Sequence, residues 1–457
     1  MNRAGFAGHA EVSHQENSSS SSSSNPVVTD IRTGRSTTLK AQDGSITRDG
    51  AQIAAGYDKF GLPTISDDSL AGDIVLSAQN GNISLNAATG TLRHQAKTRP
   101  TALALASAGS AARRLAAARL SSMSYGKGND GTTGLTHYNS HVNGTGDVTI
   151  LTNDLCLRGA AVTGNSVTAA VRNLTVESLV DTATAEARQL NLSGSIGSDG
   201  FSASGSTQKA TGDAAVVAEQ SGIHAGSGGL ELIVDKKTTL VGGLLTSEAP
   251  AELNHLETGT LEVTDVDTHS RWKADTYGAS IGSGGLSLAK VNDGESETGK
   301  AYSAIGGNIG IAITDPQHQA QDIGTIRRDT DNTNTSLPGL PDPQNVLRDQ
   351  YKTQADLQEA QKTMAGLVGD IASELYKQST TQAERDFWAE GGQGRALLHA
   401  IGGGILGGVN GWGRSPTRKG VLALAGIVRS VVRSMAPRWS RRLMALQLLA
   451  KSVPTRR

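Results

Sequence analysis

The sequence is poor in the residues that build large enzyme cores and in those that staple small secreted domains. Aromatic residues make up 3% of the 457 residues, and the single cysteine, Cys156, leaves no possibility of an internal disulfide. Because a large globular core takes much of its buried area from aromatic side chains, this composition favours many small, similar packing layers. The net charge of -1 gives the chain as a whole no attraction for nucleic acid or an anionic membrane.

Long apolar runs and, locally, acidic residues are also missing. No run of about 18 apolar residues predicts a membrane-spanning helix, and the first residues lack the apolar core of a signal peptide. Ile74–Asn129 and Arg414–Arg457 contain no Asp or Glu, and Thr91–Leu120 is rich in Arg and Ala. Neither Thr91–Leu120 nor Arg414–Arg457 shows strand periodicity. Two interpretations stay open, a basic binding arm or a reading-frame error in a GC-rich gene, and we favour the frame error for the tail.

What is present is a set of short strands separated by turn residues. Gly72–Asn80 and Gly81–Thr89 each open with Gly and then Asp or Asn, and continue with alternating Ile and Leu. Such alternation is typical of a half-buried strand, and Gly and Asn suit the tight turns between strands. From Leu155 to Leu174 the pattern completes one circuit of roughly 20 residues, which is a plausible coil of a β-helix.

Similar segments recur further along the chain, and GSGGL occurs twice, at Gly226 and Gly282. They are Ser221–Val234, Thr238–Ala249, Gly259–Val266, Gly278–Leu288 and Gly307–Thr314. Each coil has inward apolar residues that only stacking can bury. The sequence therefore predicts a mainly β fold, a right-handed parallel β-helix (β-solenoid), with a short α-helical C-terminal region. A β-sandwich of hairpins is the alternative.

Residues 346–400 change to helical spacing after a Pro-rich linker, Leu337–Pro343. The apolar positions are Leu347, Tyr351, Leu357, Ala360, Met364, Leu367 and Ile371. Beyond them, Phe387, Trp388, Arg395 and His399 form a candidate partner or translocation patch. The alternative is that the two aromatic residues pack a small helical bundle.

Several long segments resemble the hemagglutinin-repeat region of filamentous hemagglutinins and contact-dependent growth inhibition exoproteins. They are Gly126–Ile150, Leu157–Thr182, Ala214–Ala249, Leu256–Trp272, Ile309–Ala320 and Ile326–Thr330, and Phe387–Gly408 resembles the pre-toxin region of that family. The resemblance implies export by two-partner secretion through an outer-membrane transporter, and a filament at the cell surface. It also implies a receptor on a neighbouring bacterial or host cell, either for adhesion or for delivery of a C-terminal toxin. The secretion domain, the VENN motif and a toxin domain are not recognised here, so we expect a repeat and pre-toxin fragment or a pseudogene remnant.

These observations divide the chain into six parts. We expect a disordered Ser-rich lead (1–35), β-solenoid repeats (36–90 and 126–335), an irregular basic insert (91–125), a linker and helical pre-toxin-like region (336–412), and a basic tail, disordered or out of frame (413–457).

No constellation in the sequence supports catalysis, a cofactor or a metal. His137 and His141 are four apart but lie among Gly, Asn and Thr with no third ligand, so a polar loop is expected. Glu177 and Asp181 allow a carboxylate pair for a β-helical polysaccharide-acting enzyme, although carboxylates at coil turns are usually solvated. We therefore expect a structural and interaction protein that is not an enzyme.

Overall fold

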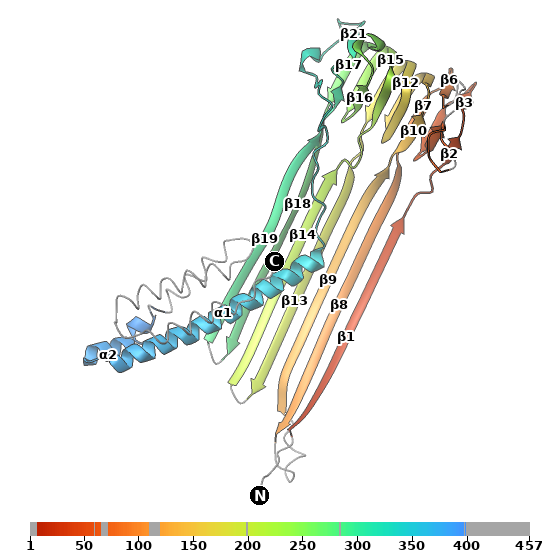
Figure 1. Cartoon of the computed structure of the whole chain (residues 1–457). Helices are drawn as coiled ribbons and strands as arrows, with labels where there is room; N and C mark the ends of the chain where they lie inside the picture. Colours follow the sequence, from red (N-terminus) through yellow and green to blue (C-terminus); the bar gives the residue numbers. More distant parts are fainter. Residues whose placement is uncertain are drawn as a thin grey trace.

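The computed structural model describes residues 7–58, 60–64, 72–108, 119–197, 200–282, 285–396 and 398. The fold is mainly β, as predicted, and its strands form two sheets, one antiparallel with seven strands and one mostly parallel with fourteen. In Figure 1 the long antiparallel strands lie below and the short parallel strands above, and one long helix crosses a face of the antiparallel sheet.

The elements of the antiparallel sheet are far longer than those of the parallel sheet. The antiparallel strands are β1 (Ala7–Ser24), β8 (Ala88–Ala108), β9 (Arg119–Tyr138), β13 (Asp181–Gly197), β14 (Gly200–Val216), β18 (Val266–Gly282) and β19 (Gly285–Ala301). The parallel strands are β2 (Asp30–Thr33), β3 (Thr37–Ala41), β4 (Ile46–Asp49), β5 (Gln52–Ala55), β6 (Ile74–Ala78), β7 (Ile83–Asn86), β10 (Ser140–Gly144), β11 (Val148–Arg158), β12 (Ala160–Glu177), β15 (Gly222–Val241), β16 (Leu244–Ser247), β17 (Asn254–Thr264), β20 (Ala304–Ile305) and β21 (Gly310–Ile313). The helices are η1 (Ala251–Leu253), η2 (Ile323–Thr325), α1 (Pro343–Gln378) and α2 (Gln382–Trp388).

The parallel strands pair in three columns, each in chain order. The first column is β2, β5, β10, the starts of β12 and β15, β16 and β20. The second is β3, β6, the start of β11, the middles of β12 and β15, the start of β17, and β21. The third is β4, β7 and the ends of β11, β12, β15 and β17. We call a set of three consecutive strand segments, one in each column, a tier. A long strand such as β12 supplies all three segments of its tier. The described residues form six complete tiers and part of a seventh.

Aliphatic side chains stack directly above one another from tier to tier. In the first column the ladder is Ile31, Ile53, Val142, Val162, Ile223, Leu245 and Ile305. In the third column Leu155 pairs with Leu174, the two residues that bound the repeat predicted from the sequence. Most of these side chains are fully buried and belong to one continuous core. Burial of each such side chain stabilises the fold by roughly 1.5–3 kcal/mol, and a single tier could not bury it.

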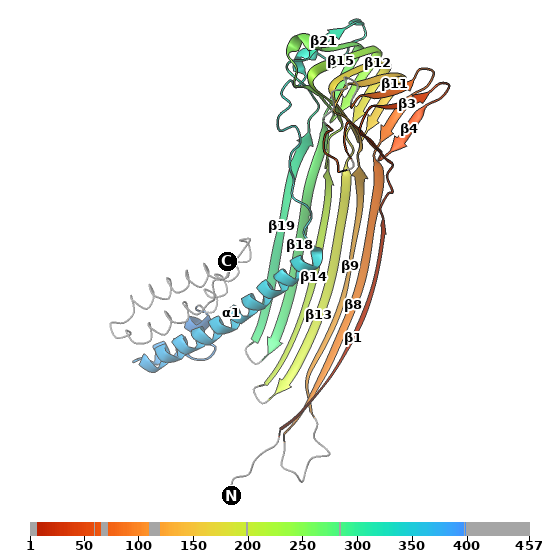
Figure 2. The same cartoon turned by 45° about the vertical axis from the view of Figure 1, so that its right-hand side comes forward.

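The antiparallel sheet is built from hairpins inserted after every second tier, which the sequence did not predict. The hairpins β8–β9, β13–β14 and β18–β19 leave the stack after β7, β12 and β17. They pair side by side in the order β1-β8-β9-β13-β14-β18-β19, and Figure 2 shows them running away from the tiers as one curved sheet. In the second GSGGL copy, Gly282 ends β18 and Gly285 begins β19, whereas the first copy, at Gly226, lies within β15 between two columns. The two copies are therefore not structurally equivalent.

Residues 7–24 of the Ser-rich lead form an edge strand, which corrects the prediction of disorder for this part of the lead. β1 pairs with β8 along its whole length, from Ala7 opposite Ala108 to Ser24 opposite Thr91. The basic insert is likewise mostly strand, in β8 and β9. Hydrogen bonds to a neighbouring strand can order a segment that has no apolar surface of its own, so composition alone misled us in both places. The basic tail, residues 413–457, lies outside the described residues.

Helix α1 crosses the antiparallel sheet near its first turns. Asp342 caps its start by accepting hydrogen bonds from the N–H groups of Gln344 and Asn345, and Pro343 occupies the first turn. Leu347 is fully buried against three alanines of the sheet, Ala187, Ala210 and Ala274. Gln350 lies beside them, accepts from Thr276 Oγ1 at 2.6 Å and donates to the carbonyl of Ala274 at 3.0 Å. The alanines thus leave space for a helix, and the glutamine satisfies the polar groups around it.

Candidate functional site

The predicted patch begins with an aromatic pair at the end of α2. The rings of Phe387 and Trp388 meet edge to face, with centroids 4.9 Å apart. Phe387 is 38% exposed. Gly394 follows closely, and a Cβ at that position would overlap both rings. The structure therefore brings the two aromatic residues together, and only glycine fits beside them.

Arg395 points into the helical region rather than toward solvent. Its Nη2 donates to Ser373 Oγ on α1 at 3.0 Å, and its Nη1 lies 3.8 Å from Glu390 Oε1. Its Nε is buried, without a hydrogen-bond partner among the described residues. His399, the fourth predicted residue, lies outside the described residues. The exposed part of the predicted patch is thus mainly Phe387.

A capping box fixes the direction in which α2 presents this pair. Thr381 Oγ1 accepts from the N–H of Glu384, and the Glu384 carboxylate accepts from the N–H groups of Thr380 and Thr381. The backbone hydrogen bonds from Thr381 and Thr380 hold the pKa of Glu384 below its usual range. This arrangement satisfies N–H groups that a helix start leaves unpaired.

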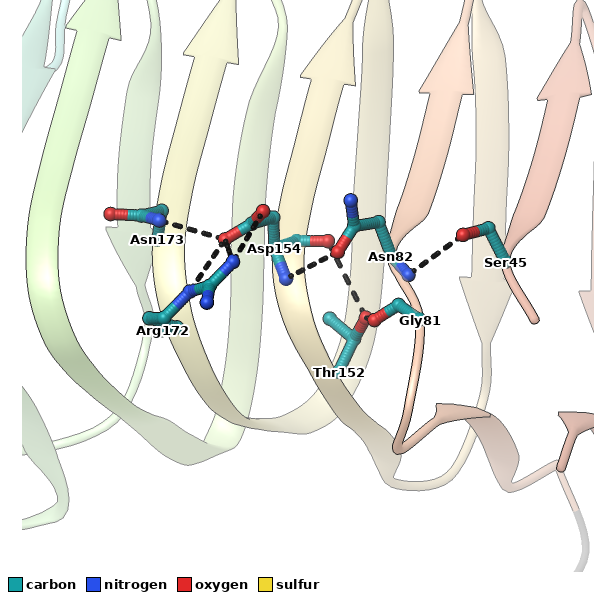
Figure 3. A network of polar contacts seen from close by, with 7 residues as sticks. All are labelled: Ser45, Gly81, Asn82, Thr152, Asp154, Arg172 and Asn173. Atoms are coloured by element: carbon teal, nitrogen blue, oxygen red, sulfur yellow. Dashed lines mark hydrogen bonds and ion pairs between the residues drawn. The ribbon is translucent and has the colours of Figure 1, made fainter. Parts of the chain in front are cut away.

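A second polar cluster runs along the corner between the second and third columns (Figure 3). Asn82 donates its N–H to Ser45 Oγ at 3.0 Å and accepts from the N–H of Asp154 at 3.3 Å. Asp154 accepts from Asn173 Nδ2 at 2.7 Å and from Arg172 Nη2 at 3.1 Å. We call Ser45, Gly81, Asn82, Thr152, Asp154, Arg172 and Asn173 the corner ladder. It links four successive tiers where the backbone turns.

Asp154 is the charged centre of the corner ladder. Partial burial favours the neutral carboxyl, but hydrogen bonds from Arg172 and Asn173, with the charge of Arg172, outweigh it and lower the pKa of Asp154. The carboxylate is therefore held ionised for a structural purpose.

Histidines that the sequence placed in a polar loop lie in strands and pair with carboxylates. His137, in β9, contacts Asp181 at 2.9 Å, and His141, in β10, contacts Glu219 at 2.6 Å. The hydrogen bond to Glu219 raises the pKa of His141. The polar-loop prediction was therefore wrong, and the described residues contain no cluster of three or more metal-ligating side chains.

The remaining sequence candidates are partnered or unreactive. Glu177 pairs with Arg158 at 2.7 Å, while Asp181 binds His137, so the two carboxylates serve separate contacts. Cys156 lies between the buried Leu155 and Leu157 and points outward, half-buried. Burial raises the pKa of the Cys156 thiol, which makes it a poorer nucleophile at neutral pH.

Two hollows occur on opposite faces of the antiparallel sheet. One, of about 180 Å³, lies between α1 and the sheet beside Tyr351 and Gln354. The other, of about 530 Å³, lies on the face away from α1 and is lined by Leu190, Tyr277 and Leu288. Sequence reasoning missed this second hollow, although Tyr277, Ile281, Leu286 and Leu288 alternate in a way that could have revealed it. Among the described helices, none combines the length and the apolar character needed to cross a membrane.

Comparison with known proteins confirms the resemblance read from the sequence. Residues 10–194 match the hemagglutinin-repeat family. That match runs through the predicted Ser-rich lead and basic insert, consistent with the strands found there. No solved structure matches the chain.

Curated relatives are CdiA proteins that are much longer than this chain. It is 34% identical over 252 residues to the tRNA nuclease CdiA of Burkholderia pseudomallei, which is 48% of this chain and 20% of that protein. It is 32% identical over 280 residues to the 16S rRNA endonuclease CdiA of Enterobacter cloacae, which is 56% of this chain and 8% of that protein. For the tRNA nuclease CdiA of Yersinia mollaretii the identity is 35% over 240 residues, 50% of this chain and 8% of the relative.

Proposed function

We propose that the chain is part of the stalk of a contact-dependent growth inhibition exoprotein, because residues 10–194 match the hemagglutinin-repeat family. The similarity to CdiA proteins over about half of the chain supports this proposal. The nuclease activities belong to those relatives by name. The proposal for this chain is a scaffold whose parent is secreted or displayed at the cell surface.

The same proposal includes a right-handed β-solenoid for the tiers. Each tier places three strands in the same chain order, and every pair between tiers is parallel. A connection between parallel strands of one sheet is right-handed in about 98% of cases. The aliphatic ladders then form the axis of a stalk, and backbone ladders hold its length.

A stalk of this kind has two proposed roles, adhesion and presentation of a C-terminal toxin to a neighbouring cell. Its partners would be a receptor on a bacterial or host cell and, for the whole parent protein, an outer-membrane transporter. Phe387, Trp388 and Arg395, with His399, remain the proposed partner or translocation patch. The support for the patch is the partly exposed ring of Phe387 beside Trp388.

The genomic surroundings test the parent protein. We expect an in-frame secretion domain upstream, a neighbouring transporter gene and a small downstream immunity gene. Stop codons and frame breaks on both sides would instead identify a decayed remnant and contradict the proposed stalk function.

Cell binding tests the adhesive role and the patch together. We expect the fluorescently labelled chain to bind bacterial cells saturably, in competition with unlabelled chain, when measured by flow cytometry. Phe387→Ala should weaken binding about tenfold, as for an aromatic residue at the centre of an interface. Tyr376→Ala, which removes another exposed aromatic ring on α1, is the matched control. Absence of saturable binding contradicts the adhesive role, and equal effects of the two substitutions contradict the patch.

A further inference from the structure

The face of the antiparallel sheet opposite α1 carries a continuous apolar surface near the hairpin ends. Side chains alternate along each strand, so Ala187, Ala210 and Ala274 face α1 and their neighbours face away. On the far face, large apolar side chains are 36–68% exposed. We call them the apolar band: Val12, Leu103, Met123, Tyr125, Leu190, Leu192, Ile196, Phe201, Tyr277, Ile281, Leu286 and Leu288.

Strand register places the band in adjacent rows across the whole sheet. Val12 is opposite Leu103, which is opposite Met123. In the next row Tyr125 is opposite Leu192. At the other side of the sheet Ile281 is opposite Leu286. The band therefore reaches from β1 to β19, and its members are side by side rather than scattered.

The face toward α1 differs sharply at the same level. Ser193 is opposite both Ser124 and Ser204 there, and Ser204 is opposite Ser280. Small hydroxyl side chains suit a surface in contact with water, and large aliphatic ones do not. The asymmetry between the faces indicates that the apolar band is covered in the working protein.

The band has a ridge and a groove of matching size. Leu190 and Leu192 stand up from β13, while the next two strands carry Gly205 and Ala279 at the level of Leu192. Leu192, Gly205, Ala279 and Leu288 line the groove of about 530 Å³. Since a ridge lies beside a groove on one face, that face is complementary to a second copy of itself.

The area of the band is sufficient for a stable interface. Twelve large side chains, each about half exposed, present on the order of 900 Å² if each is given about 150 Å², the lower end of the range for aromatic side chains. A standard interface buries about 800 Å² per partner, whereas the largest apolar patch on a typical monomer is about 300–600 Å². The band is therefore larger than the apolar patch of a typical monomer and large enough for one side of a standard interface.

We propose that two copies of this chain pack face to face through the apolar band. The Leu190–Leu192 ridge of each copy lies in the groove over Gly205 and Ala279 of the other. Sheets packed this way lie about 10 Å apart with their strands within about 30° of one another. Reciprocal fitting of ridge and groove requires the hairpin ends of both copies to point the same way.

This arrangement has a distinctive salt dependence. The row of Leu190 and the next row toward the tiers carry an excess of positive charge on the same face. Six basic residues lie there against three neighbouring carboxylates: the bases are Lys97, Arg99, Lys127, Arg188, Lys209 and Lys290, and the acids are Glu16 beside Arg99, Glu186 beside Arg188 and Asp275 opposite Lys209. In the proposed dimer these rows of the two copies lie opposite each other, so their repulsion opposes association. Salt screens that repulsion, with a Debye length of about 10 Å at about 0.1 M. Binding of the same face to an anionic lipid surface would respond in the opposite sense, because salt weakens attraction between unlike charges.

Analytical ultracentrifugation of the full chain tests the proposal. We expect a dimer that dissociates on dilution below about 1 μM and is strengthened between about 0.05 M and about 0.5 M salt. Leu192→Asp should weaken dimerisation at least tenfold. Leu92→Asp is the matched control, because Leu92 is a similarly exposed leucine on the other face of the same sheet.

A second variant separates loss of the interface from loss of the fold. Ala279→Trp fills the groove with an apolar side chain, so it should weaken the dimer while leaving the circular dichroism spectrum and the monomer's melting temperature unchanged. A wild-type chain that stays monomeric at about 100 μM overturns the proposal. Equal effects of Leu192→Asp and Leu92→Asp also overturn it, as does a monomeric chain that binds anionic phosphatidylglycerol vesicles through the band. None of these results bears on the stalk function, which the genomic test addresses.

Discussion

At the level of single residues, two side-chain amides take the place of a β-strand at the last tier. Gln319 accepts from the N–H of Leu261 at 2.7 Å and donates to its carbonyl at 2.8 Å. Gln321 does the same for Val263, at 2.7 Å and 3.1 Å. The end of β17 is thereby satisfied although the seventh tier has no third strand. This pairing also covers a sheet edge that could otherwise recruit another strand.

Removing one of these amides should destabilise the last tiers. We expect Gln319→Ala to lower the free energy of unfolding by about 1–3 kcal/mol, because two backbone groups of Leu261 lose their partners. Urea unfolding measures the change. Gln317→Ala, at an exposed glutamine two residues earlier, is the control and should leave stability unchanged. An equal loss in both variants would contradict the strand-replacement role.

Asp154 should stabilise the fold at neutral pH and lose this effect in acid. Its folded-state pKa is lowered, so the unfolded state binds a proton first as the pH falls. The stabilisation is therefore complete above the unfolded pKa of about 3.9 and is lost as the pH drops through the lower folded value. We expect the stability difference between wild type and Asp154→Asn to shrink below about pH 4 in urea titrations. Asp235→Asn, at an exposed aspartate, is the control. Its difference in stability from wild type should stay small at every pH, because it leaves Asp154 and its partners in place.

His141 should act in the opposite direction. Its pKa is raised, mainly by the hydrogen bond to Glu219, so the folded state holds the proton more tightly than the unfolded state. The added stability is complete below the unfolded pKa of about 6.5 and is lost as the pH rises through the folded value. NMR titration of His141 should show the raised pKa, and Glu219→Gln should reduce it. A pKa of His141 that is unchanged in Glu219→Gln would contradict the contact.

At the level of elements, α1 is attached to the sheet mainly through its first turns. Leu347→Ala removes a fully buried side chain from a small cluster, and such changes cost about 2–5 kcal/mol. We expect faster amide hydrogen exchange in α1 and unchanged exchange in the tiers. Tyr376→Ala, at an exposed residue near the other end of the same helix, is the control. Faster exchange in the tiers as well would show that helix and tiers unfold together.

The elements also show what the sequence could and could not predict. Ile74, Leu76, Ile83 and Leu85 are buried as predicted, because each tier has one face in the core and one in water. In the inserted hairpins many buried positions carry small or polar residues, such as Ser270, Ala274 and Thr276, so their burial cannot be read from apolar alternation. β1 is ordered by hydrogen bonds to a strand about 80 residues away in the chain, and no local pattern encodes that partner.

The residues of the predicted patch differ in how far the sequence could indicate their contacts. The adjacency of Phe387 and Trp388 is local, so the sequence placed them together correctly. The attachment of Arg395 to Ser373 depends on how the chain folds back on α1. The apolar band was missed because its members come from seven strands, and only strand register aligns them.

At the level of the whole molecule, each hairpin is an addition to a stack that is continuous without it. Ser303 N–H donates to Asp265 Oδ1 at 3.0 Å, so the two ends of the β18–β19 hairpin are close together. We expect deletion of residues 267–300 with a short Gly linker to leave the tiers folded, as judged by circular dichroism and limited proteolysis. Deletion of residues 254–264, which removes β17 from the second and third columns, should abolish folding of the last tiers. If the hairpin deletion unfolds the tiers, the two sheets are a single cooperative unit.

The spacing of the hairpins has a geometric consequence for growth and recombination of such genes. Strands repeat about every 4.8 Å in either sheet, so two tiers advance the stack by about 9.6 Å, and one hairpin widens its own sheet by the same amount. The two sheets therefore stay in step however many units are added. Gain or loss of a whole unit, two tiers with their hairpin, preserves this match, whereas gain or loss of a single tier shifts every later hairpin by half a period. We therefore expect related chains to differ in length by whole units of two tiers and one hairpin.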